Sequence, residues 1–113
     1  MHTDLATLTA EAWRLSGLID KGISALRDAA VAYAEAEHEY RERNAMAYLE
    51  TESGTVAERE AHVYALVGDF RRRRDLADGQ KLAALEAVRS RRAQLSALQS
   101  IIAAHRAESE LAR

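Results

Sequence analysis

Apolar or small residues recur every seven positions along this chain, and that spacing limits its fold more than any other feature. The first part repeats one such residue in each heptad and a second one three positions later. The first series is Leu5, Ala12, Ile19, Leu26, Tyr33, Tyr40 and Ala47, and the second is Leu8, Leu15, Gly22, Ala29 and Ala36. A row of this kind, called the seam below, is typical of a long helix that packs along another helix.

The composition agrees with long helices. The 113 residues include no Pro, five Gly and 5% aromatic residues, and strand-forming residues are sparse. A chain of this length is expected to form one domain, spanning residues 1–113.

A helix stop and a helix start lie side by side near the middle of the chain. Gly54 suits a left-handed helix end, and Thr55 followed three residues later by Glu58 forms a capping-box pattern. We therefore predict helix one over about 4–51, a turn at 52–55 and helix two over about 56–110. The seam of helix two is Val56, Val63, Val67, Phe70, Ala77, Ala84, Val88, Leu95, Leu98 and Ile102. We expect helix two to be continuous despite Gly68 and Gly79.

Two long helices joined by a short turn favour an all-α fold, a long two-helix antiparallel hairpin of coiled-coil type. In this hairpin residue k faces roughly residue 107 − k, which sets Ile19 beside Val88 and Tyr33 beside Arg74. A swapped pairing, in which the helices open at Gly54 and pair with those of a neighbour, stays open. Leucines away from the seam predict a homo-oligomer. They are Leu18, Leu49, Leu66, Leu76, Leu82 and Leu85.

Charge divides the chain at a run of four arginines, Arg71 to Arg74. Residues 1–70 hold 6 Lys+Arg against 13 Asp+Glu, a net of −7, whereas residues 71–113 hold 10 against 5, a net of +5. A polyanion such as nucleic acid would be attracted to the second part. Successive helical residues are about 100° apart, so the four arginines cannot share one stripe and some must meet protein.

Two interpretations of the arginines stay open. One is an ion-paired cluster between helices or subunits, with Arg74 stacked on Tyr33 and the rest of the run near Glu35, Glu37 and Glu39. The other is a track for phosphates. The candidate nucleic-acid-binding residues are Arg41, Arg43, Arg71, Arg72, Arg73, Lys81, Arg89, Arg91 and Arg92. Trp13 and the four tyrosines are candidates to stack on bases. Of the tyrosines, Tyr33 and Tyr40 belong to the seam, whereas Tyr48 and Tyr64 are less committed to the core.

The chain shows none of the residue patterns that we associate with catalysis. His2, His38, His62 and His105 lack zinc-ligand spacing, there is no Cys, and there is no phosphate-binding Gly-rich loop or nucleophile elbow. We expect no enzyme activity, cofactor or metal. No apolar run approaches the roughly 20 residues of a membrane span, and the first residues lack the pattern of a secretory signal, so we expect a cytoplasmic protein without membrane contact.

Two stretches resemble a known family. Residues 84–93, ALEAVRSRRA, continuing through Ala104 to Glu108, are similar to the C-terminal segment of the UvsY recombination mediators of T-even-like phages. Residues 41–49 with Ser53 and Gly54 resemble that family's basic-aromatic stretch and its Ser-Gly turn. The similarity covers residues from about 30 to about 110.

The resemblance implies a non-enzymatic accessory to homologous recombination in the cytoplasm of a phage-infected cell. It implies an all-helical homo-oligomer that binds single-stranded DNA and helps a RecA-like recombinase displace the single-strand-binding protein. Arg41 and Arg43 match the family's DNA-binding stretch best, whereas Arg71 to Arg74 have no counterpart there. The alternative is a coiled-coil interaction or structural protein that does not bind nucleic acid.

Overall fold

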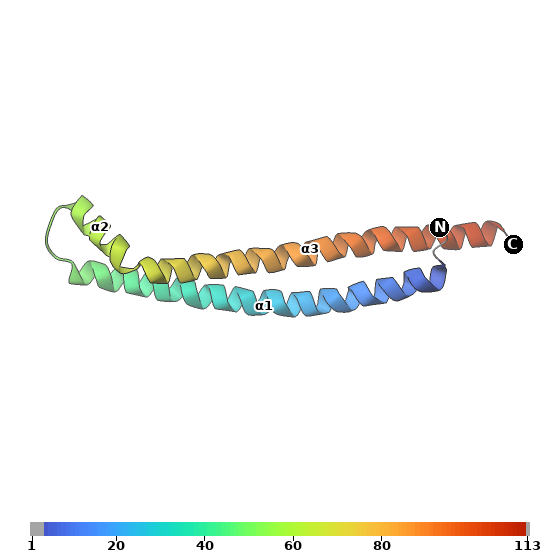
Figure 1. Cartoon of the computed structure of the whole chain (residues 1–113), viewed down its shortest axis with the longest axis horizontal. Helices are drawn as coiled ribbons and strands as arrows, with labels where there is room; N and C mark the ends of the chain where they lie inside the picture. Colours follow the sequence, from blue (N-terminus) through green and yellow to red (C-terminus); the bar gives the residue numbers. More distant parts are fainter. Residues whose placement is uncertain (1–3, 113) are drawn as a thin grey trace. The chain divides into compact units, whose positions relative to one another are not determined.

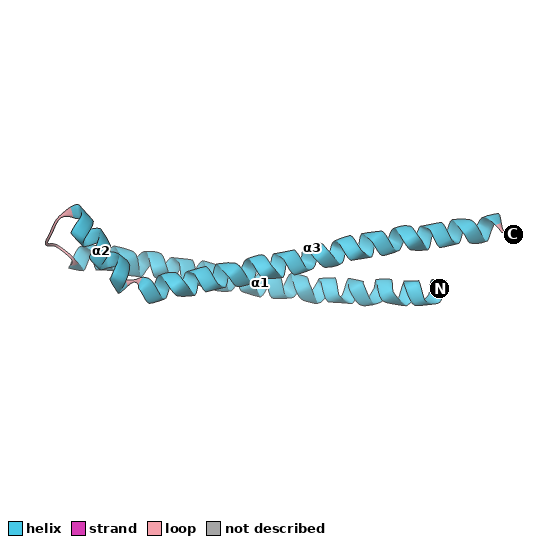
Figure 2. Ribbon diagram, turned by 45° about the horizontal axis from the view of Figure 1, so that its top comes forward, coloured by secondary structure: helices cyan, strands magenta, loops and turns pink. Residues whose placement is uncertain are grey.

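The protein is all-helical over the residues that the computed structural model describes, 4 to 112 (Figure 1). Helix α1 spans Leu5–Glu50, α2 spans Val56–Leu66 and α3 spans Gly68–Leu111. Within these residues there is no strand, and the connections between helices are short (Figure 2). The predicted fold class, with a long helix pair, is confirmed.

The chain divides into two compact units. The terminal unit comprises residues 1–25 and 84–113, so it pairs the start of α1 with most of α3. The turn unit comprises residues 26–83 and contains the rest of α1, all of α2 and the start of α3. In each unit the two chain directions are antiparallel, because earlier residues of α1 pack against later residues of α3.

Each unit has its own small core on the predicted seam. In the terminal unit Leu8 and Leu15 of α1 pack with Leu98 and Ile102 of α3. In the turn unit Ala47, Val63 and Val67 form the core, with Tyr40 and Tyr48 against it. The buried apolar residues are Leu8, Leu15, Ile19, Ala47, Val63, Val67, Ala77, Val88, Leu98 and Ile102, and the heptad spacing predicted every one of them. Two residues of the predicted seam, Val56 and Leu5, are exposed instead of buried.

The turn after α1 forms where its residues predict it. Its hydrogen bonds differ from a full capping box in two respects. Gly54 has a φ of 102°, and the Thr55 hydroxyl accepts a hydrogen bond from the Glu58 amide at 3.2 Å. A full capping box also has a return bond from the Thr55 amide to the Glu58 carboxylate, and this bond is not formed within this turn. The added contact comes from Arg59, whose guanidinium donates to the carbonyl oxygens of Thr51 at 2.7 Å and Tyr48 at 3.2 Å. It thereby caps the C-terminal end of α1.

Replacing Gly54 with alanine should lower the free energy of unfolding by about 1 kcal/mol, because a side chain at this φ is strained. The Cβ would also lie 3.0 Å from the Glu58 carboxylate. Chemical denaturation would measure the loss. The matched control is Gly79→Ala, where the added Cβ meets nothing within 4 Å and helix propensity should give a gain. Equal stability of the two variants would contradict this account of the turn.

The prediction of one continuous second helix is wrong, because the helix is interrupted at Val67. Val67 leaves helical geometry with φ −99° and ψ 12°, although its amide still donates to the Val63 carbonyl. Gly68 follows directly and has low helix propensity, and glycine is a common position for a helix kink. The second predicted helix is therefore two helices, α2 and α3.

The predicted register is also wrong, and in the turn unit the error is one heptad. Tyr33 lies under Lys81 and Tyr40 lies under Arg74, so facing residue numbers add to 114. In the terminal unit Gly22 faces Val88, three positions later than predicted. Helix α2 runs at an incline to α1 (Figures 1 and 2). Because α2 is inclined, its residues advance less along α1 than those of a parallel-running helix would. Each α1 residue therefore faces an α3 residue with a higher number than predicted.

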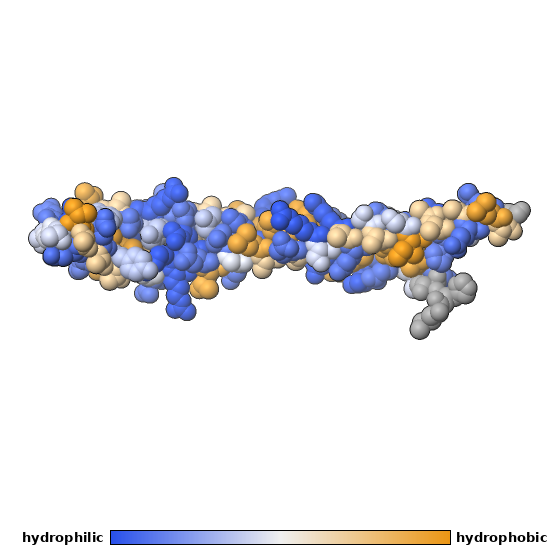
Figure 3. All heavy atoms as spheres, turned by 90° about the horizontal axis from the view of Figure 1, so that it is seen from above, coloured by the Kyte–Doolittle hydropathy of each residue, from blue (hydrophilic) through white to orange (hydrophobic). Residues whose placement is uncertain are grey.

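Several leucines that were predicted to be free of the seam are exposed. Leu49, Leu66, Leu76 and Leu82 are between 51% and 76% exposed, and Leu18 and Leu85 are half-buried. Leu76 and Leu82 do not share a face, because six residues correspond to about 240° of helical rotation. The space-filling view likewise shows apolar residues dispersed among polar ones on the face that it presents (Figure 3). Self-association stays a prediction.

Candidate nucleic-acid interface

Cations stack on the aromatic rings of the turn unit. The pairs, with the distance from the cation to the ring centre, are Arg43 and Phe70 at 5.1 Å, Arg59 and Tyr48 at 6.0 Å, Arg71 and Tyr64 at 3.5 Å, Arg73 and Phe70 at 5.3 Å, Arg74 and Tyr40 at 4.3 Å, and Lys81 and Tyr33 at 3.9 Å. Proteins typically contain about one significant contact of this kind per 70–80 residues. The turn unit thus has several such contacts, and many of its Arg and Lys side chains lie against an aromatic ring of the same unit.

Arg74 and Lys81 hold α3 against α1. The Arg74 guanidinium lies 3.7 Å from the Glu37 carboxylate and 3.0 Å from that of Asp75, and a quarter of its side chain is exposed. Burial lowers the pKa of Arg74, but the Asp75 hydrogen bond and the charges of Asp75 and Glu37 outweigh it and raise the pKa overall. Lys81 lies 3.5 Å from Asp78 and is 31% exposed. The structure thus places Lys81, a predicted phosphate ligand, against protein.

Arg71 bridges the helix break at Val67. Besides stacking on Tyr64, its guanidinium donates to the Tyr64 carbonyl oxygen at 3.2 Å, in the last turn of α2. The run was expected to lie near Glu35, Glu37 and Glu39. Among the described residues only Arg74 of the run forms an ion pair with α1, and its partner there is Glu37. The one-heptad register change explains why the expected pairs do not form.

Arg43 and Arg73 meet at a single aromatic ring. Arg43 comes from α1 and Arg73 from α3, and the guanidinium of each lies over Phe70. Arg72 and Arg73 also line one shallow groove of about 270 Å³ together with Asp69. All three arginines are exposed, and within residues 4 to 112 none of them is ion-paired to a carboxylate. We call Arg43, Arg72, Arg73 and Phe70 the Phe70 cluster.

The remaining candidates are dispersed. Arg41 is 76% exposed but pairs with Glu37 at 2.8 Å, and Arg89 is 65% exposed and lies 3.5 Å from Glu86. Arg91 donates to the Leu18 carbonyl oxygen at 3.4 Å, which ties α3 to α1 in the terminal unit. Arg92 is exposed. The predicted residues therefore fall into both units, and the structure gathers only Arg43, Arg72 and Arg73 into a cluster.

Net charge differs little between the units. The turn unit holds 9 Lys+Arg against 12 Asp+Glu and the terminal unit holds 7 against 6, giving −3 and +1. Neither unit is strongly basic as a whole. Attraction of a polyanion would depend on local groups such as the Phe70 cluster.

Neither a metal-binding group nor a membrane-spanning helix is present in the part of the chain that the structure describes. Residues 4 to 112 contain no group of His, Cys, Asp and Glu arranged to hold a metal ion, and His2 lies outside them. His38 lies 3.5 Å from Glu42, one turn away on α1. No helix in these residues is both long and apolar enough to cross a membrane.

Comparisons with known proteins give no assignment. No protein-family model, no curated protein and no solved structure matches the chain.

Sequence reasoning missed both Arg59 and Phe70 as participants in cation stacking. Arg59 has no distinguishing motif, and its role follows only from the path of the turn. Phe70 belongs to the predicted seam, but only the observed register places it beside Arg43.

Proposed function

We propose that the protein is a non-enzymatic phage recombination accessory that binds single-stranded DNA as a homo-oligomer. It would assist a RecA-like recombinase in displacing a single-strand-binding protein. The observation that supports this most directly is the Phe70 cluster, in which two helices present three exposed arginines without a carboxylate partner among the described residues. Arg43 also belongs to the stretch that resembles the UvsY family.

Binding at the Phe70 cluster depends on phosphates rather than on bases. Each arginine contributes a modest, salt-sensitive contact through the release of counterions, and three contacts per subunit give weak affinity. In a homo-oligomer these contacts would add along one strand, because a linked second site binds at a high effective concentration. Sequence-independent binding follows, as an accessory that acts on any exposed strand requires.

The double variant Arg72→Ala/Arg73→Ala should bind a labelled single-stranded oligonucleotide about tenfold more weakly at low salt. Losing two phosphate contacts should also flatten the slope of log affinity against log salt by about 1.4, since each contact on a single strand contributes about 0.7. Fluorescence anisotropy at several salt concentrations measures both quantities. Neither arginine is buried, so helicity should be unchanged.

The matched control is Arg14→Ala/Arg27→Ala, which removes the same charge outside the Phe70 cluster. If both double variants weaken binding equally, the effect is one of net charge and the cluster has no special role. Absence of binding by the natural sequence at low salt would contradict the proposed function itself.

The second candidate is a coiled-coil interaction protein without nucleic-acid binding. It is favoured by the way Arg71, Arg74 and Lys81 turn onto tyrosine rings of their own unit. In that case two of the four arginines of the run, Arg71 and Arg74, serve to hold helices together. Light scattering would measure the self-association that both candidates require, and only the oligonucleotide titration separates them.

A further inference from the structure

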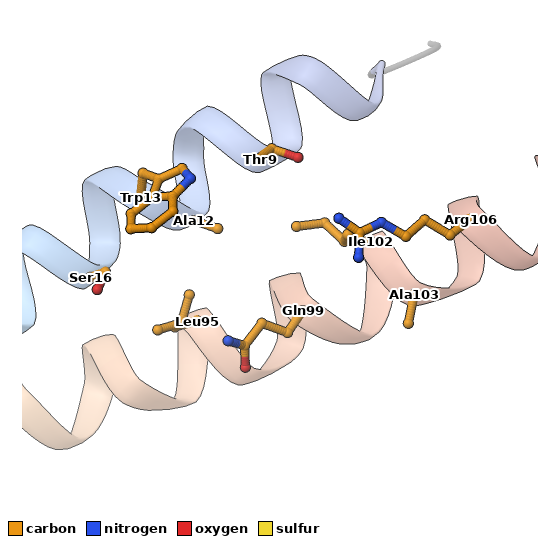
Figure 4. Close-up of a pocket in the computed structure, with 9 residues that line it drawn as sticks. All are labelled: Thr9, Ala12, Trp13, Ser16, Leu95, Gln99, Ile102, Ala103 and Arg106. Atoms are coloured by element: carbon orange, nitrogen blue, oxygen red, sulfur yellow. The ribbon is translucent and has the colours of Figure 1, made fainter.

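A groove in the terminal unit, called the Trp13 groove below, is lined by residues of both long helices, Trp13 among them. It has a volume of about 440 Å³ and lies between α1 and α3 (Figure 4). Trp13 is 74% exposed, although its ring is the largest apolar group that the chain carries. It is also the single tryptophan of the sequence.

Trp13 differs from the other aromatic residues in having a free ring face. Every tyrosine and the phenylalanine lie under a cation. Among the residues that the structure describes, no Lys or Arg stacks on Trp13. Its face is therefore available to another flat, aromatic group.

The groove combines an apolar floor with a polar edge. Leu95 of α3 faces Trp13 across the groove, Ile102 lies farther along the same helix, and Gln99 and Arg106 extend from that helix as well (Figure 4). None of the lining residues is acidic. The grooves beside Arg72 and Arg43 differ in this respect, since they include Asp69 and Glu50 respectively. The Trp13 groove thus suits a ligand that is aromatic, hydrogen-bonding and negatively charged.

A basic row follows the polar edge along α3. Arg92, Gln99 and Arg106 are seven residues apart, so they lie on one side of the helix at steps of about 10 Å. Arg92 and Arg106 are exposed and form no ion pair with other described residues. A strand lying along this edge would bring phosphates to the two arginines and a base between them.

We propose that the Trp13 groove binds a base of single-stranded DNA by stacking, with Arg92 and Arg106 contacting phosphates on either side. This inference rests on the proposed function and adds a base contact that the Phe70 cluster does not provide. Stacking on an aromatic side chain is tolerant of base identity, because every base has a π face. The apolar floor alone would suit a helix of a second copy, whereas a nucleotide matches the floor, the hydrogen-bonding Gln99 and the charge of Arg106 together.

The single tryptophan makes the test direct. Oligo(dT) and an abasic oligonucleotide of equal length and charge, both labelled, are titrated while anisotropy and Trp13 emission are followed together. We expect oligo(dT) to quench Trp13 in step with binding and the abasic strand to leave it unquenched. Trp13→Ala should weaken oligo(dT) binding about tenfold and leave abasic binding unchanged, and Trp13→Phe should restore most of the loss.

The outcomes separate this inference from the proposed function. Equal affinity for the two strands with no quenching would overturn the base contact and leave phosphate binding intact. No binding of either strand would remove both proposals. A blue shift of Trp13 emission that grows with protein concentration in the absence of DNA would show that a second copy fills the groove, and would also overturn the inference.

Discussion

Val63→Asp should lower the free energy of unfolding by about 4 kcal/mol, which is enough to abolish a cooperative thermal transition in a small domain. Val63 is 1% exposed and packs against Ala47 and Val67 in the core of the turn unit. A carboxylate there either loses its hydration or binds a proton, and both cost free energy. Circular dichroism during heating measures the effect as a loss of helix signal at lower temperature.

Val56→Asp provides the matched control, since the two valines are seven residues apart on α2 and the heptad spacing predicted both to be on the seam. Val56 is 71% exposed and begins the helix. An acidic residue in the first turn interacts favourably with the helix dipole. This variant should keep the stability of the natural sequence to within about 0.5 kcal/mol. Equal losses in the two variants would contradict the observed difference in burial.

The heptad spacing predicted correctly which residues are buried: all the buried apolar residues lie on the predicted seam. A two-helix pair has one contact stripe per helix, so a period of seven marks that stripe directly. The spacing wrongly predicts burial of Val56, because the first turn of α2 does not yet lie against α1. Leu5, the first residue of α1, is also a seam residue that is exposed. The start of α2 at Val56 was predictable because Thr55 caps it through a local hydrogen bond.

Register could not be predicted, because a shift of one heptad keeps the same residues on the seam. Tyr33 would be buried beside either Arg74 or Lys81, and the sequence alone does not distinguish the two pairings. The observed pairing goes together with the incline of α2 and the break at Val67, and the heptad spacing predicted neither of them. An error of this size leaves the core prediction correct but changes which charged residue lies over which aromatic ring between α1 and α3 in the turn unit.

The contacts of the candidate nucleic-acid-binding residues depend on which α1 and α3 residues face each other. Arg71 to Arg74 were expected to divide between protein and solvent, and they do, with Arg72 and Arg73 exposed and Arg71 and Arg74 partly covered. Their partners differ from those expected. The grouping of Arg43 with Arg73 required the coordinates, since the two residues are 30 positions apart in sequence and meet only through Phe70.

Gly22→Leu should lower the free energy of unfolding by about 2 kcal/mol, because it overpacks the place where α1 and α3 approach each other in the terminal unit. A Cβ at Gly22 would lie 3.1 Å from Cγ2 of Val88, which is tighter than ordinary contact. Val88 is 3% exposed and β-branched, so its side chain has little freedom to move aside. Denaturant titration of the full chain gives the change in unfolding free energy.

Gly17→Leu separates overpacking from the effect of glycine on the helix itself. Gly17 lies on α1 five residues earlier, and a Cβ there meets nothing within 4 Å. Replacing it should raise the free energy of unfolding by about 0.8 kcal/mol through helix propensity alone. The two substitutions are chemically identical and should act in opposite directions. Stabilisation by both would mean that the helices separate at Gly22 without cost, and that the close approach to Val88 contributes nothing to the fold.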